Sequence, residues 1–373
     1  MSVSTTSRHT ALHDEHAALG AAFTDFGGWD MPLKYGSELA EHRAVRSAAG
    51  LFDLSHMGEV RVTGPGAATF LNTALVGDLA AAAVGRAKYS LICTPEGGII
   101  DDLICYRLAE DEYLVVPNAG NAPAVLAALQ ERAAGFDVTV ADESADTSLI
   151  AVQGPSAQAV LQELVPAGQQ ELVGGLKYYF AAPATVAGTD VLLARTGYTG
   201  EDGFELYVPE ARAVPLWNAL LEAGQGHGLV PCGLACRDSL RLEAGMPLYG
   251  QELSRDLTPY EAGLGRVVSF TKEEDFVGRT ALASRRSAGT TRTLVGLRGE
   301  GRRAARGHYP VSVDGEVVGE VTSGALSPTL GHPIAMAYVD NEHAEPGTQV
   351  QVDLRGRPAP FEVVALPFYR RGQ

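Results

Sequence analysis

Two segments of the chain repeat one pattern of apolar and polar positions. Residues 59–71 (EVRVTGPGAATFL) and 149–161 (LIAVQGPSAQAVL) each place a strand-like run before Gly-Pro and an apolar helical pattern after it. The apolar helical positions are Ala67, Phe70, Leu71, Ala74 and Leu75 in the first segment, and Ala157, Val160, Leu161 and Leu164 in the second. Pro65 and Pro155 stand at the helix starts, where a missing N–H costs nothing. The pattern predicts two related α+β subdomains.

After about residue 290 the helical period disappears and short alternating segments follow one another. These segments read TRTLVGL, PVSVDGEVVGEV, IAMAYV, TQVQVDL and FEVVAL. Asp314-Gly315, between two such runs, is a strong signal for a two-residue hairpin. We therefore predict an α+β chain with two interleaved subdomains in residues 1–290 and an all-β, barrel-like domain in residues 291–373.

Composition narrows the class of protein. A chain of 373 residues is expected to form two or three domains. Its 29 Lys and Arg against 45 Asp and Glu give a net charge of −16, which argues against a nucleic-acid partner. No apolar run reaches the ~18 residues that span a bilayer, and the N-terminal residues lack the apolar core of a secretory signal. We expect a cytoplasmic protein with no membrane partner.

Neither the cysteines nor the histidines give a clear metal motif. The four cysteines are too few for a disulfide scaffold in a chain of this length, and the pair at 232 and 236 suits small buried side chains better than metal ligands. His9, His13 and His16 share the face of a possible helix, but a solvated N-terminal helix explains them equally well. No metal is predicted. Signatures of a P-loop, a dinucleotide fold, a nucleophile elbow and a zinc protease are also absent.

The segment GGIIDDLICYRL predicts a strand after a glycine turn. Alternation places Asp101, Leu103 and Cys105 on the more apolar face, and Asp102 with Tyr106 on the other. A carboxylate beside a phenol can position or deprotonate an amine. The residues alone support equally the simpler interpretation, in which the two aspartates only satisfy the turn backbone.

A second polar segment, ARTGYTGEDGFEL, predicts a glycine-rich loop followed by a strand. Glu205 lies between Phe204 and Leu206, so its side chain faces away from theirs. A buried carboxylate needs a partner with paired donors. A guanine-like ring edge is one such partner, and an arginine is another, with Arg237 as the candidate.

Six segments together resemble the aminomethyltransferase family, the T-protein of the glycine cleavage system. They are DFGGWDMPLKYG, FDLSHMGE, GGIIDDL, RTGYTGEDGFEL, CGLACRDSLRLEAGMPLYGQE and the closing PFYRRG, with VTSGALSPTLG as a further match. The resemblance covers essentially the whole chain in family order. It implies a three-domain cloverleaf around a central channel, in keeping with the duplicated α+β pattern and the β-rich C-terminal part.

The resemblance also implies a reaction and its participants. A lipoyl carrier, the H-protein, presents an aminomethyl group; tetrahydrofolate, a cosubstrate, takes the methylene and ammonia leaves. No metal and no flavin are implied. Asp102 would be the catalytic carboxylate, and Glu205 would hold the amino edge of the pterin. The remaining residues expected to bind substrate or folate are Arg237, Tyr198, Met57, Tyr89, Tyr106, Asn118, Tyr369 and Arg370.

Some features leave alternatives open. Arg266 stands where the family often has a tryptophan, and it either contacts folate or points outward. The basic stretch from Arg285 to Arg306 is either a docking surface for an acidic carrier or a solvated linker.

The rival function is a folate-dependent demethylase acting on a small methylated donor. A related folate-binding protein of iron–sulfur maintenance is disfavoured, because Gly245-Met246-Pro247-Leu248-Tyr249 lacks the cysteine of its motif.

Overall fold

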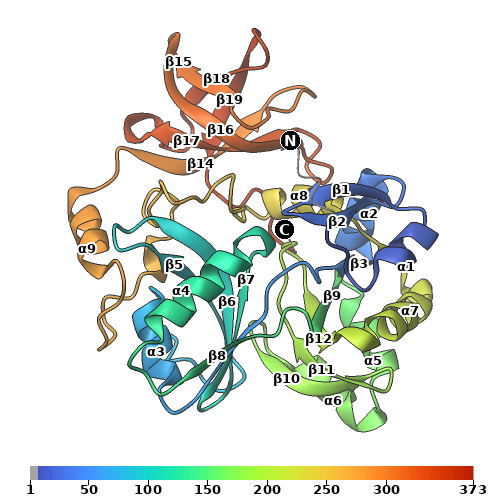
Figure 1. The fold of residues 1–373 in the computed structure, drawn as a ribbon. Helices are drawn as coiled ribbons and strands as arrows, with labels where there is room; N and C mark the ends of the chain where they lie inside the picture. Colours follow the sequence, from blue (N-terminus) through green and yellow to red (C-terminus); the bar gives the residue numbers. More distant parts are fainter. Residues whose placement is uncertain (1–6, 373) are drawn as a thin grey trace, which may run out of the picture. The chain divides into compact units, whose positions relative to one another are not determined.

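The computed structural model describes residues 7–372, which form two compact units. The first unit holds the residues up to 67 together with 82–88 and 104–238, and the second holds 68–81, 89–103 and 239–373. Figure 1 traces their elements along the chain. Within residues 7–372, no helix has the length and apolar character needed to cross a membrane.

A six-stranded sheet forms the larger core of the first unit. Its order is β10 (Ala181–Val186), β11 (Thr189–Ala194), β12 (Gly203–Pro209), β9 (Thr147–Gln153), β3 (Ala49–Asp53) and β13 (Leu229–Pro231). The neighbours pair antiparallel except β3 and β13. The apolar core against this sheet includes residues of α5 (Ala157–Leu164), α6 (Gln170–Gly175) and α7 (Ala213–Gly224), with Trp217 fully buried. The strand β12, which carries Glu205, is thus an interior strand of a packed sheet.

A five-stranded sheet has the order β5 (Ala87–Cys93), β6 (Ile99–Ala109), β7 (Glu112–Pro117), β4 (Val60–Thr63) and β8 (Thr139–Asp142). The tip of its β5–β6 hairpin, residues 89–103, is assigned to the second unit. The helices α3 (Ala67–Ala74) and α4 (Ala122–Arg132) follow β4 and β7 in the chain. Cys105 and Leu103 are buried along β6 with Asp101, as the alternation predicts. On the other face Asp102 is half-buried but Tyr106 is fully buried, so that face is not open to solvent along its whole length.

The repeated sequence pattern produces repeated local geometry. β4 leads into α3 and β9 leads into α5, each through a glycine with a positive φ, 124° at Gly64 and 129° at Gly154. A Cβ atom at Gly64 would lie 2.5 Å from the backbone oxygen of Asp137, and one at Gly154 would lie 2.6 Å from that of Ala48. Both turns therefore require glycine for conformation and for space. The two predicted strand–turn–helix units are confirmed.

The N-terminal part of the first unit departs from the expected helix. The helix α1 (His13–Ala18) begins at His13, and the hairpin of β1 (Ala22–Phe26) and β2 (Trp29–Lys34) follows, then α2 (Glu38–Ser47). His16 is fully buried: its Nε2 lies 2.9 Å from Asp53 Oδ2, and its Nδ1 lies 2.8 Å from the Tyr35 hydroxyl. His16 is therefore a core residue and does not share a surface with His9 and His13.

The second unit contains the predicted all-β part as a closed six-stranded barrel. Its order is β14 (Arg292–Gly299), β17 (Pro333–Asp340), β16 (Glu316–Leu326), β15 (Pro310–Val313), β18 (Gln349–Asp353) and β19 (Pro358–Val364). Asp314 and Gly315 join β15 to β16 with φ values of 51° and 88°, as expected for a type I′ hairpin turn. A core of valines, alanines and Phe361 fills the barrel. The α+β class with a C-terminal barrel is confirmed, whereas the division at residue 290 stays a prediction.

The basic stretch is not a linker along its whole length. Arg285 and Arg286 lie in α9 (Arg279–Ala288), and Arg292 and Arg298 lie in β14. Arg298 Nη2 donates a hydrogen bond of 2.8 Å to Glu362 Oε2, and Arg306 Nη1 donates one of 2.8 Å to the carbonyl oxygen of Gly324. Arg302 and Arg303 are exposed in the loop between β14 and β15, where a docking role stays a prediction.

Candidate active site

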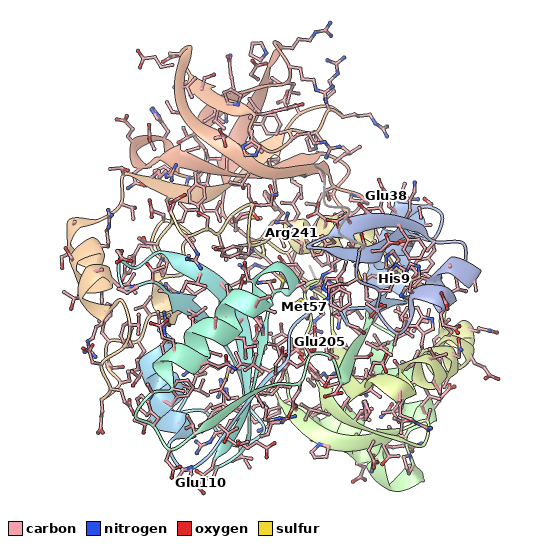
Figure 2. All side chains as sticks on the ribbon, viewed as in Figure 1. His9, Glu38, Met57, Glu110, Glu205 and Arg241 are labelled. Carbon is pink, nitrogen blue, oxygen red and sulfur yellow. The ribbon has the colours of Figure 1, made fainter. Side chains whose placement is uncertain are left out.

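Glu205 is a buried carboxylate that its own unit supplies with donors. Its side chain is 8% exposed, and strand alternation turns it away from the core that contains Phe204 and Leu206. Figure 2 marks the position of Glu205 in the first unit. The Thr196 hydroxyl makes a short hydrogen bond to Glu205 Oε2, and the Tyr106 hydroxyl donates to the same oxygen at 3.4 Å. The sequence alone left the partner of this carboxylate open. The structure gives it two hydroxyl donors.

A line of hydroxyl groups extends from the carboxylate into the unit. The Tyr106 hydroxyl lies 2.9 Å from Thr196 Oγ1, and the Tyr207 hydroxyl donates to that of Tyr106 at 3.3 Å. Burial is the main cause that raises the pKa of both tyrosines well above 10, with neighbouring Glu205 adding to the effect. Both phenols are therefore protonated near neutral pH and act as donors.

The charge state of Glu205 reflects two opposing influences. Burial raises the pKa of the carboxyl, while the Thr196 hydrogen bond, the positive charge of Arg237 and the Tyr106 hydrogen bond lower it. The balance is an elevated pKa. A ligand that brings further N–H donors to the carboxylate would favour the ionised form, because hydrogen bonds to the charged form stabilise it.

Arg237 and Tyr198 form the second contact pair of this region. The helix α8 (Leu234–Glu243) carries Arg237, whose guanidinium lies 4.7 Å from the ring centroid of Tyr198. Both side chains are half-buried. An aromatic ring with a guanidinium on its face can take part in stacking with a planar heterocycle.

The loop that carries Thr196 and Tyr198 is held by residues that the sequence analysis did not single out. Gln153 Nε2 donates 3.0 Å to the carbonyl oxygen of Thr196, and Thr199 Oγ1 donates 3.0 Å to Gln153 Oε1. Arg195 pairs with Asp202 across the loop. A Cβ atom at position 197 would lie 2.0 Å from Gln153 Oε1, so the glycine there admits the amide. The glycines of RTGYTGEDGFEL were the sequence signal that could have pointed to these supporting residues.

His56 is a further residue near Arg237 that the sequence analysis passed over in favour of its neighbour Met57. It is 2% exposed, and its ring meets that of Phe26 edge-on at 5.4 Å. Burial, and then the positive charge of Arg237, lower the pKa of His56 to about 4, while Asp53 acts in the opposite direction. The imidazole is therefore neutral near neutral pH. The motif FDLSHMGE was the signal that could have identified it.

Asp102 lies half-buried on β6, in the part of that strand that belongs to the second unit. The Tyr89 hydroxyl donates 3.0 Å to Asp102 Oδ2, which joins two of the predicted site residues. The backbone N–H of Ile99 donates to the carbonyl oxygens of Ser254 and Leu257, and a Cβ atom at Gly98 would lie 2.0 Å from the backbone oxygen of Arg255. The hairpin is thus fixed by close backbone packing, which sets the position of the Asp102 carboxylate.

The other predicted residues lie outside the α-helices and strands. Met57 is half-buried after β3, and Asn118 is half-buried before the short 3₁₀ turn Ala119–Asn121. Tyr369 is half-buried with its backbone N–H on the Glu243 carbonyl oxygen at 2.8 Å, whereas Arg370 is exposed. Arg266 is exposed in Gly265–Val267.

The candidates fall into one set in each unit. The first unit holds Met57, Tyr106, Asn118, Tyr198, Glu205 and Arg237, and the second holds Tyr89, Asp102, Tyr369 and Arg370. Contacts join Tyr106 to Glu205, Arg237 to Tyr198, and Tyr89 to Asp102.

Arg241 and the cysteine pair have structural surroundings. Arg241, four residues after Arg237 on α8, is 2% exposed and pairs with Glu252 at 2.9 Å and with Ser323 Oγ at 2.8 Å. Cys232 and Cys236 are buried, and burial raises the pKa of the Cys232 thiol well above 9. A buried thiol that resists ionisation is a poor metal ligand.

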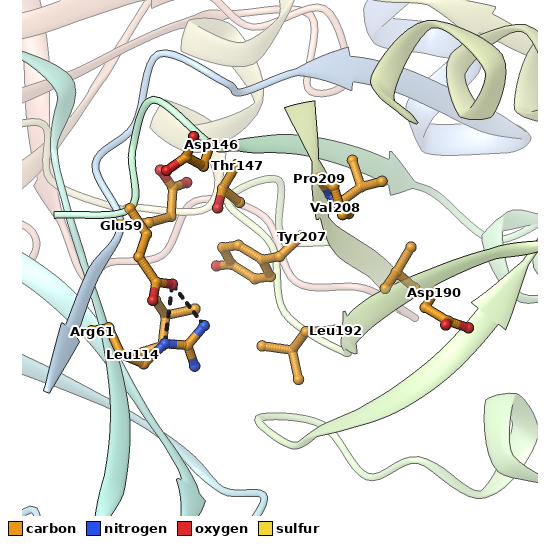
Figure 3. Close-up of a pocket in the computed structure, with 12 residues that line it drawn as sticks. Glu59, Arg61, Leu114, Asp146, Thr147, Asp190, Leu192, Tyr207, Val208 and Pro209 are labelled. Carbon is orange, nitrogen blue, oxygen red and sulfur yellow. Dashed lines mark hydrogen bonds and ion pairs between the residues drawn. The ribbon is translucent and has the colours of Figure 1, made fainter. Parts of the chain in front are cut away.

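Tyr207 also lines a separate cleft of about 320 Å³ in the first unit (Figure 3). Glu59 lines this cleft with 0% exposure, and within residues 7–372 neither of its carboxylate oxygens has a hydrogen-bond partner. Burial raises the pKa of Glu59 well above 4.5, and the charges of Asp142 and Glu143 add to the effect. This carboxyl has no donors that would hold it ionised.

Comparison with known proteins decides the family. The family model for the GCVT N-terminal domain matches residues 12–272, and the model for the glycine cleavage T-protein C-terminal barrel domain matches residues 292–370. The chain belongs to the glycine cleavage T-protein family. An aminomethyltransferase of Streptomyces avermitilis is 65% identical over 98% of both chains, and one of Bacillus subtilis is 45% identical over 98% of this chain and 99% of its own.

A solved structure agrees with this assignment. The glycine cleavage system aminomethyltransferase T from Bartonella henselae matches with a TM-score of 0.90 and 38% identity, over 97% of this chain and 98% of that one. The resemblance stated from the motifs is thereby confirmed at the level of family and fold.

Proposed function

We propose that this chain is the aminomethyltransferase of a glycine cleavage system. It would transfer the methylene of an aminomethyl group from a lipoyl carrier protein to tetrahydrofolate. Membership in the family, with aminomethyltransferase relatives that align over nearly their whole length, supports the activity. The single structural observation that supports it best is the buried Glu205 carboxylate, beside hydroxyl donors and near Arg237 and Tyr198.

The pterin of tetrahydrofolate suits this arrangement. Its exocyclic amine and adjacent ring N–H offer two parallel donors, and a carboxylate accepts such a pair in a bidentate manner. Thr196 and Tyr106 already donate to Oε2, so the folate edge would complete the hydrogen bonds of a buried charge. The Tyr198 ring, with Arg237 on its face, offers a surface for the flat pterin.

Asp102 is proposed as the catalytic carboxylate. The reaction forms bonds from the methylene carbon to N5 and N10 of tetrahydrofolate and breaks its bonds to the amine nitrogen and to sulfur. The two protons lost from N5 and N10 equal those gained by the departing ammonia and by the lipoyl sulfur. A half-buried carboxylate is suited to accept and return a proton during these steps. Tyr89 holds Asp102 Oδ2 at 3.0 Å and would fix its orientation.

The test is ammonia release from an aminomethylated lipoyl carrier, measured with and without tetrahydrofolate. The proposal predicts release that depends strongly on folate and yields 5,10-methylenetetrahydrofolate in equal amount. The carrier without the aminomethyl group is the control. Folate binding without folate-dependent release from the carrier would contradict the transferase and support a demethylase with a small methylated donor.

A further inference from the structure

Three metal-ligating side chains converge at the N-terminal edge of the first unit, away from the Glu205 region. Among the described residues, His9, His13 and Asp30 form the one group of three or more such side chains whose donor atoms all lie within 4.8 Å of one another. The three residues come from different parts of the chain. Asp30 lies on β2, His13 begins α1, and His9 precedes that helix.

The backbone fixes two of these positions. The N–H of Arg8 donates 2.9 Å to the carbonyl oxygen of Gly28, and the N–H of Asp30 donates 2.8 Å to that of Arg8. The Arg8 guanidinium covers the Trp29 ring at 3.9 Å. This pairing holds the segment with His9 against β2, so His9 is placed beside Asp30 by main-chain hydrogen bonds and not by side-chain attraction.

The contacts among His9, His13 and Asp30 do not give all of their polar atoms a hydrogen-bond partner. His9 Nε2 lies 3.9 Å from Asp30 Oδ2, which is too long for a hydrogen bond. His13 Nδ1 is buried and has no hydrogen-bond partner within residues 7–372. The rings of His9 and His13 stack at 3.7 Å between centroids, and the His13 ring also packs at 4.6 Å from that of Phe23. A buried imidazole nitrogen without a partner beside a carboxylate indicates a missing ligand.

We propose that His9, His13 and Asp30 bind one divalent transition-metal ion of the zinc type. Two imidazoles and one carboxylate are a common ligand set for such ions, whereas magnesium and calcium prefer oxygen ligands. Bonds of about 2.1 Å place ligand atoms roughly 3 to 3.5 Å apart, so the group has to close by about 1 Å. The exposed His9 side chain provides this movement by rotation, which also separates the stacked rings.

The bound ion would connect the segment before α1, the helix itself and the β1–β2 hairpin. His16 takes no part, since its two ring nitrogens face Asp53 and Tyr35. The sequence analysis grouped three histidines and assigned no metal. The ligand set differs from that group because the β1–β2 hairpin brings in Asp30, whose place beside His9 is not visible from spacing.

The test uses the full chain without an affinity tag, freed of metal by a chelator and titrated with Zn²⁺ by calorimetry and with Co²⁺ by visible absorption. We expect one equivalent of Zn²⁺, a Co²⁺ absorption band, and no displacement by Mg²⁺. Thermal unfolding should shift upward with Zn²⁺, because the ion binds the native state. His13→Ala and Asp30→Asn should each lower the affinity at least about tenfold and abolish the shift.

His308→Ala is the matched control. His308 also lies beside a carboxylate, with Nδ1 2.9 Å from Glu320 Oε1, but it is not part of the three-donor group. Its replacement should leave the Zn²⁺ affinity unchanged. Wild-type protein that binds no equivalent of Zn²⁺, or that binds it as tightly after His13→Ala and Asp30→Asn, would overturn the proposal. Thermal unfolding of each variant without metal verifies that it is folded.

Discussion

Two buried carboxylates of the first unit, Glu205 and Glu59, both act on the pKa of Tyr207 and differ in what surrounds them. Glu205 accepts hydrogen bonds from Thr196 and Tyr106 and feels the charge of Arg237, whereas Glu59 has no hydrogen-bond partner within residues 7–372. Burial raises the pKa of both. Of the two, only Glu205 has neighbours that lower its pKa and so offset the free-energy cost of burying a charged carboxylate.

We propose that this difference makes Glu205, and not Glu59, a carboxylate that binds a ligand. A buried charge is tolerated when donors satisfy it, and a ligand that supplies the remaining donors gains from that arrangement. Without donors, a buried carboxyl avoids the cost by staying protonated. Glu205 is therefore prepared to hold a ligand with N–H groups, while Glu59 is expected to be neutral. Asp102 is half-buried beside the Tyr89 hydroxyl, a setting that suits the proposed proton transfer.

The largest expected effect concerns Asp102. Asp102→Asn keeps the shape but removes the basic oxygen, so we expect kcat to fall by about 10²–10⁴-fold while the folate dissociation constant changes little. Steady-state ammonia release and equilibrium folate binding measure the two quantities. Asp314→Asn, in the exposed turn of the barrel, is the control and should leave both unchanged. Unaltered turnover of Asp102→Asn would refute the catalytic role.

Removal of a single donor to Glu205 should have a smaller effect. Thr196→Val deletes the hydroxyl that bonds Oε2, so it raises the pKa of Glu205 further and weakens folate binding by about 1 kcal/mol, roughly fivefold. Isothermal titration with folate measures the change in affinity. Thr185→Val removes a hydroxyl that bonds the carboxylate of Asp190 on the neighbouring strand and should leave folate affinity as it is. Equal weakening in both variants would contradict the assigned role of Thr196.

The Glu59 carboxyl makes a prediction about stability and pH. Its raised pKa means that the folded state keeps a proton which the unfolded state loses, so the stability contributed by this group declines as the pH rises above about 4.5. Glu59→Gln removes the titration. Because wild type loses this contribution as the pH rises and the variant does not, the variant should become more stable relative to wild type from pH 5 to pH 8.

Denaturant unfolding at both pH values measures the gain. Glu110→Gln, an exposed glutamate in the same unit, is the control and should show no such change with pH. A Glu59→Gln variant whose stability relative to wild type is the same at pH 5 and pH 8 would show that Glu59 is not held protonated.

The smallest effect is expected on the barrel surface. Charge reversal of Arg302 and Arg303 to Glu should raise the apparent KM for an acidic lipoyl carrier a few-fold at low salt, and less at high salt, because steering is screened. Reversal of Arg355 and Arg357, both exposed at the β18–β19 turn, is the matched control. A KM that does not change would support a solvated loop without a docking role.

The features that could be predicted from the sequence are those that the pattern of a few neighbouring residues determines. The repeated Gly-Pro turns, the Asp314-Gly315 hairpin and the alternation that buries Asp101 but not Asp102 all follow from periods of a few residues. Contacts between distant segments were not predictable in this way. Gln153 supports the Thr196 loop from 43 residues away, and Lys272 Nζ binds the carbonyl oxygens of Asn72, Leu75 and Gly77 at the end of α3.

The same reason explains why only part of the candidate site could be predicted from the sequence. Glu205 and Asp102 stand in dense motifs, so strand alternation sufficed to choose them. Thr196 and His56 lie inside those motifs too, but their roles depend on Tyr106 and Arg237, which other strands and helices bring close. The spacing of residues along the sequence does not show which distant segments come into contact.

The most direct test of the account is a tetrahydrofolate titration of wild type, Glu205→Gln and Glu59→Gln under identical conditions. The account predicts that Glu205→Gln raises the dissociation constant about 30-fold, equivalent to ~2 kcal/mol, since an amide replaces a charge-assisted acceptor. Glu59→Gln should bind folate like wild type. Wild-type affinity in Glu205→Gln, or equal weakening in both variants, would contradict the distinction between a donor-satisfied carboxylate that holds the ligand and one that does not.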